Sequence, residues 1–148
     1  MLLWGIVRVP RTTLLAVCSL FALGAIAADV LLPDAYACSQ EESSVEQHKC
    51  LGRKAREREA RISSAEHRVR DAINRWDEEQ KYRDRSLDLL ETSRKAYLAQ
   101  RSEVCEVEAS TAADGNAARD LRLMCQERWD IKWIEQLAIL EKMYGHGA

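Results

Sequence analysis

Tyr97, Arg101 and Cys105 follow one another at intervals of four residues in the segment SRKAYLAQRSEVC. Residues four apart lie on one face of a helix, so this spacing predicts that a phenol, a guanidinium and a thiol face the same neighbour. Aromatic and arginine side chains are enriched at binding hot spots, which makes Tyr97 and Arg101 candidate binding residues. The alternative is structural: Tyr97 packs between helices, and Arg101 pairs with a carboxylate or a helix end. The heptad position of Tyr97 favours this alternative.

Other residues of suitable chemistry lack the spacing that catalysis needs. His48, His67 and His146 have no recurring partner spacing, and no glycine-rich phosphate loop is present. Carboxylates are abundant because 31% of the residues are charged, and in a helical chain most of these lie on solvated faces. We therefore predict no catalytic, metal-binding or cofactor-binding residues, and we expect a binding protein that is not an enzyme.

The N-terminus has the features of an export signal. Arg8 and Arg11 precede an uncharged apolar segment, TLLAVCSLFALGAIA, and Ala25 and Ala27 form an A-x-A cleavage motif. An uncleaved membrane anchor is the alternative, but the apolar run of about 16 residues is shorter than the roughly 20 needed to span a bilayer. We predict a signal peptide over residues 1–27, cleaved near Ala27, and a periplasmic or secreted protein without stable membrane insertion.

Charge limits the kinds of partner. Loss of residues 1–27 leaves 121 residues, enough for one domain with a modest core. It removes two of the 22 basic residues and none of the 24 acidic ones, so the net charge becomes −4. A nucleic-acid-binding domain is expected to carry a basic footprint, so we predict no nucleic-acid partner. The acidic balance suits a cationic protein partner.

Four cysteines remain after the signal peptide, namely Cys38, Cys50, Cys105 and Cys125. An even number in a small exported chain predicts a disulfide framework, with three pairings possible in principle. Structural zinc is the rival interpretation, but the close Cys-x2–4-Cys pairs typical of such sites are absent. Two disulfides are therefore the better prediction.

Helix geometry limits how these cysteines pair. On one straight helix, Cys38 and Cys50 would lie about 18 Å apart, and Cys105 and Cys125 about 30 Å apart. Both distances far exceed the ~7 Å limit for a disulfide, so local pairing requires a bend in each interval. The second interval contains Gly115, and the first contains the serine-rich stretch SQEESS. We predict the pairs Cys38–Cys50 and Cys105–Cys125.

An apolar stripe with helical spacing occupies the centre of the chain, where no glycine or proline occurs between Gly52 and Gly115. The stripe is interrupted at residues 77–86, where Arg83 occupies the next apolar position. One interpretation is a single long helix with a solvated middle. The other, which we favour, is a turn between two antiparallel helices, because folding back buries both stripes. The residues of the stripe are Ile62, Ala65, Val69, Ala72, Trp76, Leu90, Tyr97 and Val104.

A further helix is predicted after the turn residues of ADGNAARD. The fold class is all-α, a small up-down helical bundle of three main helices and a short N-terminal helical piece, tied by two disulfides. We predict an irregular lead-in over residues 28–37, the helical domain over 38–144 and a frayed tail over 145–148. The apolar residues of the last helix are Leu121, Met124, Trp129, Trp133, Leu137 and Leu140.

The chain resembles the LprI-type lysozyme inhibitor family over about residues 38–137. The family's first cysteine pair is spaced as in CSQEESSVEQHKC, with a glutamate that matches Glu46. Its alanine-aromatic-x3-arginine-x3-cysteine run matches Ala96, Tyr97, Arg101 and Cys105. A glycine-containing loop and a final cysteine match Gly115 and Cys125. The family usually has tryptophan at position 97, glutamine at 94 and arginine at 133, where this chain has Tyr97, Arg94 and Trp133.

This resemblance implies an exported helical domain whose partner is a lysozyme-like glycoside hydrolase. Such enzymes act through two carboxylates that flank the sugar bond, so an inhibitor need only exclude substrate from the cleft. The loop STAADGNAARD, residues 110–120, is the candidate plug, and it makes Asp114, Gly115 and Asn116 candidate binding residues. The alternative function is a structural or adaptor module of the cell envelope without lysozyme inhibition. No oligomeric state is predicted.

Overall fold

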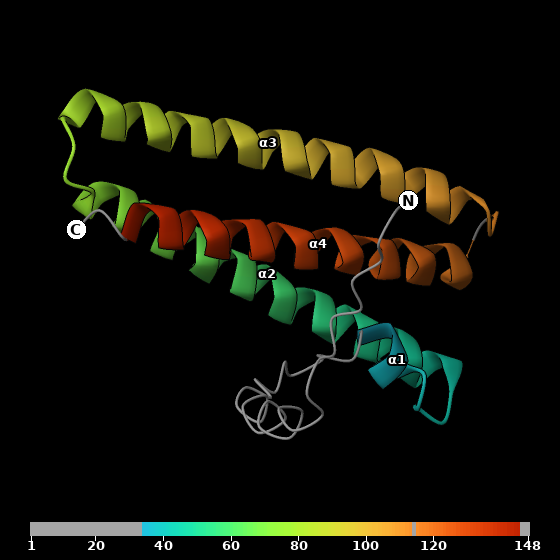
Figure 1. Ribbon diagram of the computed structural model, residues 1–148. Coiled ribbons are helices and arrows are strands. Elements are labelled where there is room, and N and C mark those ends of the chain that lie inside the picture. The colour runs from blue at the N-terminus through green and yellow to red at the C-terminus, as the bar shows by residue number, and fades with distance from the viewer. Residues whose placement is uncertain (1–33, 114, 146–148) are drawn as a thin grey trace, which may run out of the picture. The chain divides into compact units, whose positions relative to one another are not determined.

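The computed structural model describes residues 34–113 and 115–145 of the chain. They form four helices: α1 (Asp34–Cys38), α2 (Ser44–Arg75), α3 (Gln80–Ser110) and α4 (Asn116–Gly145) (Figure 1). The predicted all-α up-down bundle with two disulfides is confirmed. The predicted signal peptide over residues 1–27, its cleavage point near Ala27 and residues 146–148 of the predicted tail lie outside the described residues. Gly145, predicted as the start of that tail, is the last residue of α4.

The lead-in predicted as irregular over residues 28–37 is helical from Asp34 onward, because α1 begins there. The proline that suggested irregular chain, Pro33, directly precedes this helix, and proline is tolerated at a helix start because the missing N–H has no helical partner there. The segment after it contains no further helix breaker. The Ser39 hydroxyl donates to the Tyr36 carbonyl at 2.8 Å where the helix ends.

The turn between α2 and α3 occupies residues 76–79, so the two-helix interpretation is confirmed. It contains neither glycine nor proline. Arg83 closes it with its guanidinium, which donates to the carbonyl oxygens of Trp76 at 3.1 Å and Glu78 at 2.7 Å. Arg83, the charged residue that interrupts the apolar stripe, thus supplies hydrogen-bond donors to the carbonyl groups of the turn.

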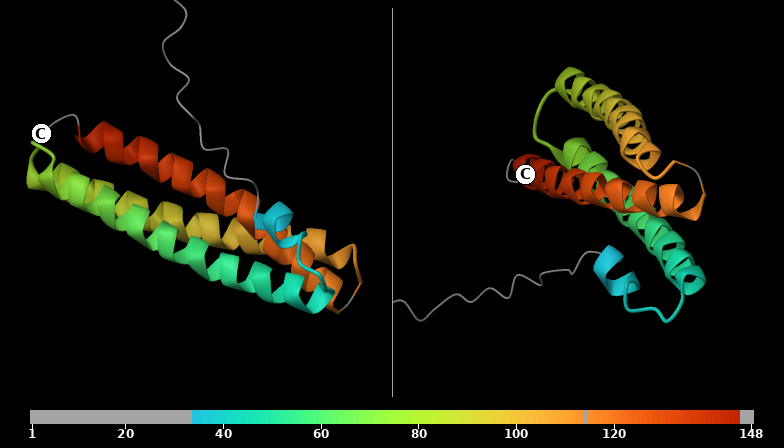
Figure 2. Two further views of the ribbon diagram at one scale, coloured as in Figure 1. Left: turned by 90° about the horizontal axis from the view of Figure 1, so that it is seen from below. Right: turned by 90° about the vertical axis from the view of Figure 1, so that its right-hand side faces the viewer.

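Helix α4 packs against both α2 and α3, which contact each other much less (Figure 2). The main core is built from buried apolar residues of all three long helices, and the edge-to-face pair of Trp76 and Tyr144, with ring centroids 5.2 Å apart, covers one end of it. These core residues are Ala65, Val69 and Ile73 of α2, Leu90 of α3 and Leu137 of α4.

The expected register fails at Val104, which is 42% exposed. The buried contact line of α3 advances in steps of four, through Tyr97, Arg101, Cys105 and Ala109. Steps of four exceed the 3.6-residue helical turn, so the line winds around the helix. Cys105 therefore faces inward at this end, and Val104 turns toward solvent.

Both predicted disulfides are present. Cys38–Cys50 has a Cα–Cα distance of 5.6 Å and ties α1 to α2, while Cys105–Cys125 has one of 5.4 Å and ties α3 to α4. All four cysteines are buried, none more than 4% exposed. Each loop closure is expected to stabilise the fold by about 3 kcal/mol, chiefly by restricting the unfolded chain.

Candidate functional site

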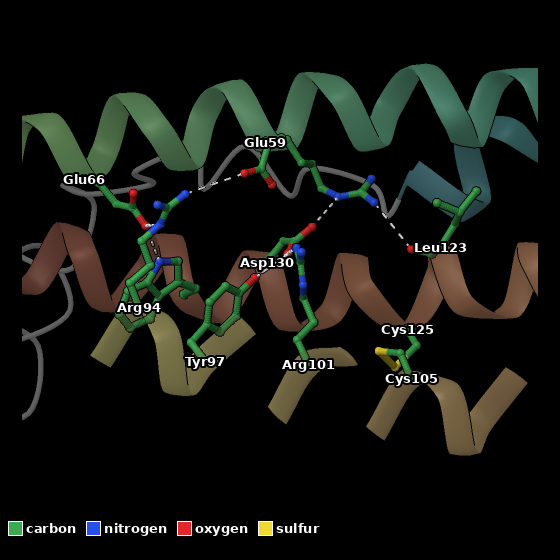
Figure 3. Close-up of polar contacts among 11 residues, drawn as sticks. Glu59, Glu66, Arg94, Tyr97, Arg101, Cys105, Leu123, Cys125 and Asp130 are labelled. Carbon is green, nitrogen blue, oxygen red and sulfur yellow. Dashed lines mark hydrogen bonds and ion pairs between the residues drawn. A yellow bond between two sulfur atoms is a disulfide. The ribbon is translucent and has the colours of Figure 1, made fainter. Parts of the chain in front are cut away.

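The common neighbour of the Tyr97–Arg101 stripe is Asp130 of α4. The Tyr97 hydroxyl donates to Asp130 Oδ1, and Arg101 donates to the same oxygen at 2.5 Å. From α2, Arg58 Nε donates to Asp130 Oδ2 at 3.3 Å. Figure 3 shows Asp130 facing Tyr97 and Arg101 from the opposite helix. One carboxylate therefore links all three long helices.

This cluster lies inside the protein. Arg58 and Asp130 are each 3% exposed and Tyr97 is 8% exposed. Burial raises the pKa of Tyr97 above its usual value, and the hydrogen bond to Asp130 raises it further. Burial is the largest single influence on Arg101 and lowers its pKa, but the hydrogen bonds and charges of Asp130 and Tyr97 together outweigh it and leave the arginine pKa raised. Tyr97 is thus held as a neutral donor and Arg101 as a cation.

A second cluster adjoins the first through stacked rings. Glu66 Oε1 accepts a hydrogen bond from Trp133 Nε1 at 3.2 Å and lies 2.9 Å from Arg94 Nε. Trp133 stacks on Tyr97 with ring centroids 4.9 Å apart and an interplanar angle of 8°. The two clusters together connect α3 and α4 to each other and to α2 by directional contacts.

These contacts agree with the structural interpretation of Tyr97 and Arg101. The structure brings both to one partner, with Cys105 one turn further along, as the spacing predicted. Little of Tyr97 is accessible to a separate protein, since its ring and hydroxyl are engaged. A binding role for these two residues stays a prediction.

Sequence reasoning missed Asp130 and Arg58. Asp130 shares a seven-residue repeat with Leu137 and Tyr144, and Arg58 shares one with Ala65 and Ala72. A charge at a heptad position that is otherwise apolar indicates a buried partner of opposite charge. That signal was present in both helices.

The loop predicted over residues 110–120 is shorter, because α3 continues to Ser110 and α4 begins at Asn116. Asn116 is therefore the first helical residue, which corrects its placement in a loop, and Asp114 lies outside the described residues. Gly115 adopts a φ of 97°, a conformation that glycine alone adopts without strain, and Ala113 has a φ of 56°. The described residues between α3 and α4, 111–113 and Gly115, are hereafter the tip turn.

The histidines in the described part of the chain contact carboxylates. His48 Nδ1 lies 2.6 Å from Asp120 Oδ1, which links the start of α2 to α4, and His67 lies 3.5 Å from Asp71 on the same helix. Within residues 34–113 and 115–145, no group of three His, Cys, Asp or Glu side chains is placed to hold a metal ion.

No protein-family model, no curated protein and no solved structure matches this chain. Fold and site define it as a small helical protein whose long helices are fixed by a buried polar cluster and two disulfides. Disulfides in so small a domain are typical of proteins that fold in an oxidising, extracytoplasmic compartment. None of the described helices is long and apolar enough to cross a membrane.

Proposed function

We propose that the protein is exported through its N-terminal signal and inhibits a lysozyme-like muramidase by obstructing the enzyme's cleft, without catalysis of its own. The observation that carries the proposal is the geometry of the tip turn. The resemblance of the run Ala96, Tyr97, Arg101 and Cys105 to LprI-type inhibitors supports the same partner.

The tip turn joins the ends of α3 and α4, and most of its described residues are exposed. Thr111, Ala113 and Gly115 are exposed, and Figure 1 shows the turn at the opposite end of α3 from the turn that joins α2. Small buried residues, Ala109 and Ala118, lie at the two helix ends beside it. An exposed turn at the end of a helix pair suits insertion into a concave substrate cleft.

The tip turn is also braced. The Cys105–Cys125 disulfide ties the two helices behind it. Arg122 donates to both carboxylate oxygens of Glu106 at 2.7 and 2.8 Å across the same helix pair. Ties between the helices behind a turn limit the conformational entropy that is lost when the turn binds. Because muramidases require access of a sugar chain to two carboxylates, a plug that occupies the cleft suffices to stop them.

A cell-wall turbidity assay tests this proposal. Purified exported protein is titrated against a panel of muramidases, and we expect it to slow lysis by at least one of them. Replacing residues 111–115 with a Gly-Ser linker of equal length should weaken inhibition about tenfold or more, since the contact segment at the interface centre is removed. The matched control replaces Asp77 and Glu78, in the turn between α2 and α3, with serine and should inhibit normally.

One outcome would contradict the role of the tip turn, and another would contradict muramidase inhibition itself. Undiminished inhibition by the linker variant rejects the tip turn as the plug while leaving muramidase inhibition in place. Absence of inhibition by the wild-type protein across the panel rejects the function itself. Circular dichroism and a non-reducing peptide map establish that each variant keeps its helices and disulfides.

An adaptor role in the cell envelope is the second candidate, favoured by exposed apolar side chains along α3. Leu89 is 57% exposed, Val104 42% and Val107 71%. Scattered apolar residues are normal on surfaces, but these share one helix with few contacts to α2. The adaptor proposal predicts a fixed-stoichiometry complex with one envelope protein that L89K and V107K together disrupt, while muramidase activity is unaffected.

A further inference from the structure

A hollow lies between α3 and α4. On α3 it is lined by the small residues Ser93 and Ala96 together with Tyr97 and Gln100, and on α4 its wall carries Trp129 and Trp133. The hollow measures about 360 Å³, which falls within the range of small-molecule sites, about 300–1,000 Å³. It shares no residue with the tip turn.

One of its aromatic rings is held in place before any ligand arrives. Trp133 donates its indole N–H to Glu66 at 3.2 Å and stacks on Tyr97. Trp129 lies one helical turn earlier on the same helix and also lines the hollow. Because this ring is already held in place, a ligand that binds it causes little further loss of side-chain entropy.

Among the polar side chains around the hollow, the Tyr97 hydroxyl is bonded to Asp130, while four others have no partner among the described residues. Arg94, Arg122 and Arg128 of the same two helices each pair with a glutamate. Within the part of the chain that the structure describes, these four side chains make no hydrogen bond or ion pair. These are Ser93 and Gln100 of α3 and Lys132 and Gln136 of α4.

We propose that this hollow binds a pyranose saccharide that carries a carboxylate. The C–H face of a pyranose ring suits the negative face of an indole. Sugar hydroxyls both donate and accept, as do the side-chain amides of Gln100 and Gln136 and the hydroxyl of Ser93. Lys132 supplies an ammonium for the carboxylate.

A proline-rich peptide is the competing ligand, because aromatic grooves also bind polyproline helices. The backbone of such a peptide offers mainly carbonyl acceptors, since proline has no N–H. The amide oxygens of Gln100 and Gln136 would then lack donors from the ligand. A hydroxyl-rich ligand satisfies both halves of each amide, so the saccharide fits the hollow better.

Indole N–H signals in NMR spectra of the purified exported protein test the assignment directly. Titration with tri-galacturonic acid should shift the signals of Trp129 and Trp133 saturably and leave that of Trp76, at the far end of the core, unchanged. Maltotriose, which is neutral, should bind about fivefold more weakly, the difference expected from one exposed ion pair. Absence of a saturable shift with either saccharide overturns the proposal, as does a proline-rich peptide that shifts the same signals when the saccharides do not.

Two substitutions separate the carboxylate contact from the rest of the hollow. Lys132→Met should weaken tri-galacturonate binding about fivefold and leave maltotriose binding unchanged, with the thermal midpoint unaltered because Lys132 makes no ion pair with the described residues. Lys142→Met, on the same helix but outside the hollow, is the matched control and should change neither affinity. Equal affinities of wild-type protein for the two saccharides, or equal losses in both lysine variants, overturn the carboxylate assignment.

Discussion

The two sides of α4 meet their neighbours through different balances of apolar and polar contact. Toward α2, Leu137 packs into Val69 and Ile73, and all three side chains are at most 1% exposed. Polar contacts of α2 with Asp130 and Trp133 accompany this packing. Toward α3, the contacts are the Asp130 cluster, the ring stack of Tyr97 on Trp133 and a disulfide. Leu90 is the one residue of α3 in the main buried cluster as the structure describes it.

This difference distinguishes contacts that attract two helices from contacts that set their relative position. Apolar burial is favourable but non-directional, so the packing of α2 on α4 does not depend on any single atom, although polar bonds add to it. A hydrogen bond or disulfide depends on distance and angle, so it sets where α3 lies along α4. Since α3 makes few contacts with α2, we expect its position to depend on these directional contacts far more than that of α2 does.

Asp130→Asn provides the strongest test of this dependence. The substitution removes the negative charge that Arg58 and Arg101 contact in a buried site, and breaking one partner of a buried ion pair costs about 3–5 kcal/mol. Urea denaturation of wild type and variant gives the change in free energy of unfolding.

The control for Asp130→Asn is Glu141→Gln, which removes the exposed partner of Arg68 at 3.0 Å on the α2 side of α4. An exposed pair contributes about 0–1 kcal/mol, so this variant should unfold nearly as wild type does. Similar losses in the two variants would contradict the distinction between the buried cluster and the surface.

Replacing Cys105 and Cys125 together by alanine should lower the free energy of unfolding by about 3 kcal/mol. Hydrogen exchange sharpens the comparison, because we expect amides of α3 to lose protection more than those of α2. Removing Cys38 and Cys50 instead is the matched control, and its losses should concentrate at α1 and the start of α2. Equal loss of protection in α2 and α3 after removal of Cys105 and Cys125 would show that α3 has no special dependence on its disulfide to α4.

The pairing of the cysteines could be predicted because distance alone required a bend in each interval. The turn at residues 76–79 could be predicted only as the better of two alternatives, since it has no glycine or proline. Its closure depends on three-dimensional contacts of Arg83 with two carbonyl oxygens, and local sequence patterns do not encode those contacts.

Of the candidate site, only the residues on α3 could be predicted from the sequence. The four-residue spacing of Tyr97, Arg101 and Cys105 indicated a shared neighbour, and that neighbour is α4. Asp130 itself was not identified because the last helix was interpreted from its apolar stripe, and the tryptophans of that stripe lie on either side of Asp130. The hollow beside Trp129 could not be predicted either, since it depends on which small residues of α3 lie opposite those rings.

Tyr97→Phe should have a smaller effect, about 1 kcal/mol at neutral pH, the usual contribution of a single hydrogen bond. Because the folded-state pKa of Tyr97 is raised, its stabilising contribution is complete below the ordinary tyrosine value of about 10 and is lost as pH rises toward the folded value. Urea denaturation in steps from neutral to alkaline pH should therefore show the wild type losing stability faster than the variant above that value. A constant difference between the two proteins across this range would rule out the coupling of Tyr97 to Asp130.

Glu106→Gln should have the smallest effect, although its ion pair with Arg122 joins the same two helices. The bond from Arg122 lowers the pKa of Glu106, so any contribution is present above the ordinary glutamate pKa and lost as pH falls through the folded value. Because the Glu106 side chain is 64% exposed, water and salt screen the pair, and the urea midpoint at neutral pH should match that of wild type. Carboxyl NMR titration of the wild type should find the lowered pKa, and added salt should raise it. A large loss of stability in this variant would mean that surface ion pairs align α3, and the Asp130 cluster would then lose its distinct role.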